Sequence, residues 1–354
     1  MSTYPCINIH LDKITENTQN MVGVCKACNV SPTGVTKLAC AYPEVGQAIL
    51  NGGIKILSDS RISNLKKIRH LDAVTMLLRL PALSEISDVI KYADISLNSE
   101  AKTLEALSEE AVKQDKLHKV ILMHDLGDLR EGSFYDEETL ALSRKAIELP
   151  GIELVGLGTN LACYGGVEPT AENQTRLVDL AKQIETELDI KLQYISGASS
   201  AGLNLLLDGE LPKEINQLRL GASLMMGIGL NDDPVPDTRQ DTFTLTAEII
   251  EIKIKPSVPV NSTALDAFGN KPEFIDRGLR KRAICAIGKQ DVDISEITPV
   301  DKDIIVIGGS SDHLILDIDY CKKPYEIGSL VEFELTYGAV LQCMTSEYVC
   351  KHFV

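Results

Sequence analysis

The chain has no hydrophobic run near the roughly 20 residues that a membrane-spanning helix needs. Its first residues, MSTYPCINIHLDK, also lack the basic start and apolar stretch of a secretory signal, so we expect a cytoplasmic protein. Basic residues are in deficit, and the formal net charge of the 354 residues is -16. Such a charge repels phosphate backbones and argues against nucleic acid as a partner. A membrane is not expected as a partner either.

Paired cysteine and histidine motifs are nearly absent. The nine cysteines are scattered, and Cys25 with Cys28 form the single CxxC. Zinc ligands usually come as two such pairs, or as one pair with histidines at a fixed spacing, and neither pattern accompanies this motif. We therefore predict no metal site and interpret these thiols as buried residues of a helix.

Short repeats and low-complexity segments are absent as well, and what recurs is a strand-like apolar run followed by a helix-like stretch. The strand-like runs cover residues 33–37, 54–60, 74–81, 94–99, 119–125, 153–160, 193–200 and 217–223. Apolar residues at helical spacing lie between them, as in 43–53, 83–93, 99–114 and 170–188. Eight alternations in about 220 residues favour an α/β fold of the (β/α)8 TIM-type barrel. An open doubly wound sheet would carry GxGxxG after its first strand, and none follows here.

The helical spacing stops at the Pro/Asp-rich stretch 231–237, which is typical of a linker. Strand-like alternation then dominates, in residues 242–255, 281–288, 303–318 and 329–341. We predict a barrel over residues 11–235 and a C-terminal β-domain over 236–354 that the N-terminal strand 1–10 joins.

Polar residues gather where the predicted barrel strands end, and active sites of such barrels lie at those ends. They are Lys37, Ser58–Arg61, Arg79, Asn98, His124–Arg130, Asn160, Ser199–Ser200 and Arg219–Ser223. Lys37 ends the first strand in an apolar context, where a cation is costly to desolvate, so its pKa should fall and its amine become nucleophilic. A snorkelling lysine or a buried ion pair explains this single residue about as well.

The opening YPCINIHLDKITENTQNM, and further segments in the same order along the chain, resemble the alanine racemase family. Members of that family hold pyridoxal phosphate (PLP) on a lysine of a barrel, so the resemblance assigns Lys37 to this cofactor. It covers most of the chain and places it in the alanine/ornithine racemase branch. The implied activity is PLP-dependent racemisation of an amino acid by a homodimer.

Four segments carry the resemblance: HDLGDLREG, SGASSAGL, NQLRLGASLMMGIG and FELTYGAVL. The first implies that Arg130 contacts the cofactor's phenolate oxygen and the substrate carboxylate. The others imply Arg219 at the pyridine nitrogen, with the phosphate held by Ser200, the Gly221 and Ala222 amides, and Tyr337. Hydroxyl groups and backbone N–H groups are what a phosphate requires, although Ser200 and Gly221 also suit ordinary loop-to-helix capping.

Arginine at the pyridine nitrogen has a chemical consequence, because it cannot accept the ring proton and leaves the ring a weaker electron sink. A less delocalised carbanion regains its proton at Cα quickly, which favours racemisation. Two further residues depart from the family. Tyr42 follows Lys37 by one residue more than the family's phosphate-contacting tyrosine, and Asn160 stands where the family has a histidine beside the ring.

Racemisation needs proton transfer on both faces of the carbanion, and Lys37 serves one. In the family a tyrosine of the partner's β-domain serves the other, but Asn261 and Ser262 stand where Tyr-Gly is expected. GGSSDHLILDI resembles the family segment that reaches the partner's site, so Asp312 and His313 are the candidate bases. A structural Asp–His pair is the alternative, and Ser310 and Ser311 then orient the substrate carboxylate.

The predicted function is therefore α-proton abstraction from an external aldimine, with ornithine, lysine, alanine or serine as the substrate and active sites completed across the dimer interface. One alternative is a non-catalytic PLP-binding homeostasis protein, which would lack the β-domain. Another is a PLP-dependent decarboxylase, whose glycine-rich phosphate loop and Cys-Glu-Ser/Asp signature we do not find.

Overall fold

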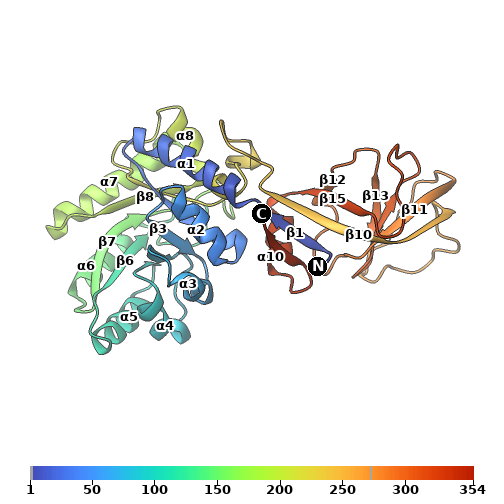
Figure 1. Ribbon diagram of the computed structural model, residues 1–354. Coiled ribbons are helices and arrows are strands. Elements are labelled where there is room, and N and C mark those ends of the chain that lie inside the picture. Colours follow the sequence, from blue (N-terminus) through green and yellow to red (C-terminus); the bar gives the residue numbers. More distant parts are fainter. Residues whose placement is uncertain (1–2, 272) are drawn as a thin grey trace. The chain divides into compact units, whose positions relative to one another are not determined.

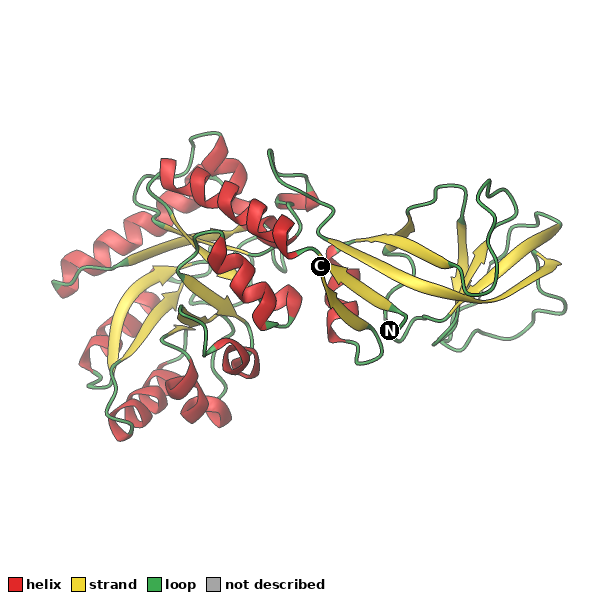
Figure 2. Ribbon diagram, viewed as in Figure 1, coloured by secondary structure: helices red, strands yellow, loops and turns green. Residues whose placement is uncertain are grey.

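The computed structural model describes residues 3–271 and 273–354 and divides the chain into two compact units (Figure 1). One unit is Leu11–Gln240, and the other combines the stretch up to His10 with Asp241–Val354. The first holds alternating helices and strands, and the second is mostly strand (Figure 2). Among the described residues, no helix has the length and apolarity to cross a membrane.

The first unit is a closed barrel of eight parallel strands, as the sequence predicts. The strands follow the order β2 (Ser31–Val35), β3 (Ile56–Asp59), β4 (Val74–Leu77), β5 (Ile95–Asn98), β6 (His118–Met123), β7 (Ile152–Gly158), β8 (Tyr194–Ser199) and β9 (Gln217–Leu220). β9 closes the barrel on β2, with Thr33 opposite Arg219. Ile56, Met76, Leu97, Ile121 and Met123 belong to one buried cluster contributed by several strands.

Helices surround the barrel strands, and α2 to α8 each return the chain from one strand to the next. They are α1 (Leu11–Ala27), α2 (Pro43–Asn51), α3 (Ile62–Ile68), α4 (Ile86–Tyr92), α5 (Ala101–Lys113), α6 (Asp136–Glu148), α7 (Ala171–Leu188), α8 (Leu203–Leu207) and α9 (Ala222–Met225). α7 shows how its sequence sets its start, because the side chains of Thr170 and Asn173 cap each other's backbone N–H groups.

Asn17 joins the two ends of the barrel segment. Its side chain is fully buried in α1, and Nδ2 donates to the Arg239 carbonyl at 2.8 Å. Oδ1 of the same amide accepts the Arg239 backbone N–H at 2.6 Å. The side chain of Asn17 therefore connects the first helix of the barrel unit to the last residues of that unit.

The second unit is built on an antiparallel sheet with the order β12 (Ile297–Pro299), β15 (Leu330–Leu335), β10 (Phe243–Pro256), β11 (Leu279–Cys285), β14 (Leu314–Asp317) and β13 (Ile305–Gly309). β1 (Cys6–Ile9) pairs with β10 and with β16 (Cys350–Phe353). The sheet thus contains strands from both ends of the chain.

One element of this unit differs from the sequence prediction. The alternation over residues 329–341 predicts a strand, but β15 ends at Leu335 and α10 (Tyr337–Thr345) follows. Thr336 caps the helix by accepting the Ala339 N–H, and Ala339, Val340, Cys343 and Met344 are buried at helical spacing. The unit is therefore not all-β.

Candidate active site

The loops that leave the carboxyl ends of the barrel strands carry most of the predicted site residues. Lys37 follows β2, Arg130 follows β6 and Asn160 follows β7, while Ser200 follows β8 and Arg219 lies in β9. Because parallel strands end at one rim of a barrel, this topology brings residues far apart in sequence to the same face.

Lys37 opens a short turn outside the strand, since β2 ends at Val35 and a 3₁₀ helix covers Lys37–Ala39. Its side chain is exposed, so the expected burial is wrong, because the chain turns out of the barrel wall at Thr36. Cys40 and Ala41 follow with φ of 49° and 50°, a strained left-handed conformation for residues other than glycine. Lys37 therefore lies on a turn whose backbone conformation is restricted.

Asp59, one of the strand-end residues Ser58–Arg61 to which the sequence assigns no role, holds this turn from the neighbouring strand. Its Oδ2 accepts the Thr36 hydroxyl at 2.8 Å, and its Oδ1 accepts the Asn64 amide at 3.0 Å and the Arg61 N–H at 2.9 Å. Burial raises the pKa of the Asp59 carboxyl, and these hydrogen bonds work against that rise. The only sequence signal was a carboxylate at a strand end.

Lys67 of α3 fixes the far side of the same turn. Its Nζ donates to the Cys40 carbonyl at 2.9 Å and lies 5.7 Å from the centre of the Tyr42 ring. Tyr42 is half-buried at the start of α2, and burial raises the pKa of its hydroxyl. Tyr42 therefore stays protonated and able to donate a hydrogen bond at neutral pH.

Arg219 is the buried cation of the site, with 3% of its surface exposed. Its Nη1 donates to the Ser196 hydroxyl, and its Nη2 donates to the Thr159 carbonyl and, at 2.7 Å, to Asn160 Oδ1. Burial lowers the pKa of Arg219 to about 10, so it remains charged at neutral pH. It offers donors but cannot accept a proton there.

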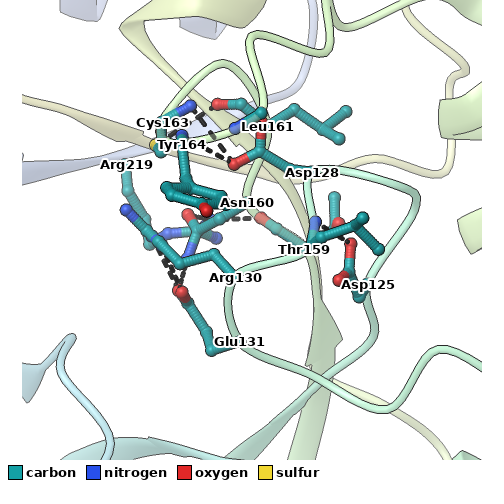
Figure 3. A network of polar contacts seen from close by, with 12 residues as sticks. Asp125, Asp128, Arg130, Glu131, Thr159, Asn160, Leu161, Cys163, Tyr164 and Arg219 are labelled. Atoms are coloured by element: carbon teal, nitrogen blue, oxygen red, sulfur yellow. Dashed lines mark hydrogen bonds and ion pairs between the residues drawn. The ribbon is translucent and has the colours of Figure 1, made fainter.

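Glu131 binds Arg130 directly and is linked to Arg219 through the side-chain amide of Asn160 (Figure 3). Asn160 Nδ2 donates to Glu131 Oε1, and Arg130 donates from Nε to Oε2 and from Nη2 to Oε1, the latter at 2.7 Å. The hydrogen bonds with Glu131 raise the pKa of Arg130. Glu131 follows Arg130 directly but has no sequence signal of its own.

Asp128 organises the loop after β7 against the loop after β6. Its carboxylate accepts the backbone N–H groups of Tyr164 at 2.9 Å, Gly165 at 3.1 Å, Val167 at 3.3 Å and Cys163 at 3.4 Å. The two loops that bring Arg130 and Asn160 to the site are therefore connected to each other as well as to the barrel.

Ser200 lies where β8 and β9 end and faces the start of α9. Its Oγ accepts the N–H groups of Gly221 and Ser223 at 3.2 Å and lies 3.0 Å from the Ser223 hydroxyl. Gly221 packs closely on β2, since a Cβ there would lie 3.1 Å from the Val35 Cβ. These N–H groups donate to Ser200 here, and together with the two serine hydroxyls and the start of α9 at Ala222 they are donor groups of the kind that a phosphate accepts from.

The remaining predicted residues belong to the sheet unit. Tyr337 is the first residue of α10 and is half-buried. Asp312 is exposed and His313 is half-buried between β13 and β14, with His313 Nδ1 2.8 Å from Asp312 Oδ1. His313 lowers the pKa of Asp312, and the Ser310 and Ser311 hydroxyls donate to the same carboxylate at 3.3 Å.

Comparisons with known proteins decide the family. The family model described as alanine racemase, N-terminal domain, matches residues 9–228. The chain belongs to the alanine racemase family. The ornithine racemase of Acetoanaerobium sticklandii is 42% identical over 99% of this chain and 100% of its own length. The lysine racemase of Thermotoga maritima is 38% identical over 98% of each chain.

Solved structures share the fold. An alanine racemase of Clostridium difficile has a TM-score of 0.78 at 18% identity. The match covers 100% of this chain and 97% of the Clostridium difficile chain. The Bartonella henselae alanine racemase, described with covalently bound pyridoxal phosphate, has a TM-score of 0.74 at 16% identity, with 100% of each chain covered. These comparisons confirm the predicted fold, a barrel followed by a β-sheet domain. They also confirm the predicted enzyme class, a PLP-dependent amino-acid racemase.

Proposed function

We propose that this racemase interconverts the L and D forms of ornithine, with lysine as a second substrate. The observation that carries the proposal is similarity along the whole chain to an ornithine racemase at 42% identity and a lysine racemase at 38%. The alanine racemase of Clostridium tetani, in contrast, is 24% identical over 54% of this chain. Alanine and serine are therefore weaker candidates.

We propose that Ser200, Gly221, Ala222, Tyr42 and Tyr337 hold the cofactor's phosphate. Arg219 donates a hydrogen bond toward the ring nitrogen and, being charged, leaves that nitrogen without a proton. Arg130 binds the substrate carboxylate, and Asn160 orients the Arg219 guanidinium. PLP, when bound, supplies the electron-withdrawing group that makes the Cα–H bond acidic.

Lys37 binds the cofactor and moves the Cα proton on one face of the substrate. We propose Asp312 and His313, which are hydrogen-bonded to each other at 2.8 Å, as the group that moves the proton on the opposite face. In this assignment the imidazole exchanges the proton and the carboxylate orients the ring.

We further propose a cytoplasmic homodimer in which the partner supplies Asp312 and His313. All nine cysteines lie in the described residues as reduced thiols, which fits a reducing compartment. The connection between β10 and β11 exposes Val260 by 81%, Leu265 by 64% and Ile275 by 68%. Large apolar side chains exposed to this degree on one connection favour a surface that another chain covers.

Incubation of the PLP-loaded enzyme with single L-amino acids in deuterated water tests the function. We expect L-ornithine to lose optical rotation and gain deuterium at Cα, faster than L-alanine and L-serine. Cofactor absorbance without exchange of any amino acid would refute catalysis and favour a PLP-binding homeostasis protein. Release of carbon dioxide would instead identify a decarboxylase.

A further inference from the structure

Glu131 occupies a place in the site that no assigned role explains. It lies at the barrel rim with 15% of its side chain exposed, between two arginines that both serve the proposed reaction. A carboxylate held among substrate-binding cations competes with an anionic substrate for their donors. Its position there indicates a function of its own.

The hydrogen bonds define what Glu131 does to Arg130. Both carboxylate oxygens accept from one guanidinium, Oε2 from Nε and Oε1 from Nη2. A bidentate pair of this kind fixes the plane of an arginine as well as its position. Arg130, with 41% of its side chain exposed, would otherwise sample many conformers, so Glu131 restricts an exposed side chain to one orientation.

The same carboxylate is linked to Arg219. Glu131 Oε1 accepts from Asn160 Nδ2, whose amide oxygen accepts from Arg219 Nη2 at 2.7 Å. The amide of Asn160 can satisfy both neighbours in only one orientation, because Glu131 needs a donor and Arg219 an acceptor. Figure 3 shows the four side chains converging.

We propose that Glu131 is a positioning residue that orients Arg130 directly and Arg219 through Asn160, while its charge offsets those of the two guanidinium groups. The inference rests on the proposed function, since it assigns Glu131 to the arginines of that site. It requires two separable properties of the side chain, its reach and its negative charge.

Two conservative variants separate these properties. Glu131→Gln keeps the length of the side chain and removes its charge. The group whose titration changes the bound cofactor's absorbance should then favour its deprotonated form. We expect the pH midpoint of the bound cofactor's visible absorbance to fall by about one unit, and KM for L-ornithine to rise roughly 10- to 100-fold. Glu131→Asp keeps the charge but shortens the reach, so KM should rise while the midpoint changes by less than about 0.3 unit.

The controls exclude a loss of folding. Glu187→Gln removes the carboxylate of another Arg–Glu pair, Arg144 with Glu187 on the helical surface, and should change neither quantity. Apoprotein melting temperatures should agree within a few degrees among all variants. The double variant Glu131→Gln with Asn160→Ala should have a KM no more than about twofold above that of the more damaging single variant. Both substitutions disrupt the same hydrogen-bond network, so their effects should not add.

The outcomes are distinct. A wild-type protein that develops no visible absorbance with PLP would refute the proposed function itself. A wild-type enzyme that racemises ornithine, with an unchanged midpoint and KM in Glu131→Gln, would refute only the role of Glu131. A rise in KM for ornithine but not for alanine, at an unchanged midpoint, would overturn the inference in favour of direct contact with the substrate's distal ammonium group.

Discussion

Residues at the barrel rim are held in position by different hydrogen bonds, and the turn that carries Lys37 is an example. This turn is restrained from two sides, by Thr36 on Asp59 and by Lys67 on the Cys40 carbonyl. The position of Lys37 was predictable because a strand end and a family motif coincide there. The role of Asp59 was not predictable, because a buried carboxylate that accepts hydrogen bonds from neighbouring loops leaves no spacing pattern in the sequence.

Lys37→Ala should abolish the visible absorbance of the enzyme mixed with PLP and lower kcat by at least about 10³-fold, since both cofactor attachment and one proton transfer are lost. Absorbance titration and polarimetry measure the two effects. Lys113→Ala, on the exposed face of α5, is the control and should leave both unchanged. Retained absorbance in Lys37→Ala would contradict the central assignment.

His313→Gln should lower racemisation about 10²- to 10⁴-fold, while one enantiomer of ornithine still exchanges its Cα proton in deuterated water with retained configuration. The remaining exchange is expected because Lys37 still serves its own face. NMR on each enantiomer separately measures it. His352→Gln replaces an exposed histidine elsewhere in the sheet unit and is the control. If the loss instead follows Asp312→Asn alone, the carboxylate is the base.

At the scale of elements, strand order and helix order followed from apolar spacing, whereas element ends depended on single capping residues. Thr336 stops β15 and starts α10, which a window of alternating residues across 329–341 conceals. The polar contacts of the loops after β6 and β7 were equally hidden, since Asp128 and Glu131 act on backbone and side chains far along the chain.

The pairing of β5 with β6 predicts a pH dependence of stability. His118 is buried, its Nε2 lies 2.8 Å from the Ser96 hydroxyl, and burial lowers the pKa of its ring to about 4. An unfolded histidine titrates near 6.5, so the unfolded chain gains a proton first as pH falls. The stability is fully present above about pH 6.5, and about 3 kcal/mol is lost between there and pH 4.

Urea unfolding at several pH values measures this loss, and the informative quantity is the difference between wild type and His118→Gln. The wild-type protein should lose more free energy of unfolding than the variant across the window. His70→Gln removes an exposed histidine and should behave as the wild type does. Equal slopes in wild type and His118→Gln would show that His118 contributes nothing.

The junction of β9 and α9 makes a second prediction. Gly221→Ala places a Cβ 3.1 Å from the Val35 Cβ, so β2 or the start of α9 must shift where we propose the phosphate binds. We expect the Kd for PLP to rise about tenfold, measured by absorbance titration. Gly23→Ala in α1 meets no atom within 4 Å and should leave PLP affinity unchanged.

At the scale of the whole molecule, the proposed homodimer rests on the apolar connection between β10 and β11. Val260→Lys with Ile275→Lys should shift sedimentation from dimer toward monomer and lower activity in proportion, because a charged side chain is costly to bury at an interface. Val112→Lys, at an exposed apolar position on α5, should leave the oligomeric state unchanged. A fully active monomer would contradict the assignment of Asp312 and His313 to the partner.

The buried amide of Asn17 bears on how the chain reaches its native state. β1 must find β10 and β16, which are separated from it by more than two hundred and more than three hundred residues of chain. Closing such long loops is slow in an unfolded polypeptide. Once the barrel has folded, however, Asn17 holds residue 239 beside α1, so the two strands that leave the barrel emerge as neighbours. We therefore expect β1 and β10 to pair after the barrel has folded.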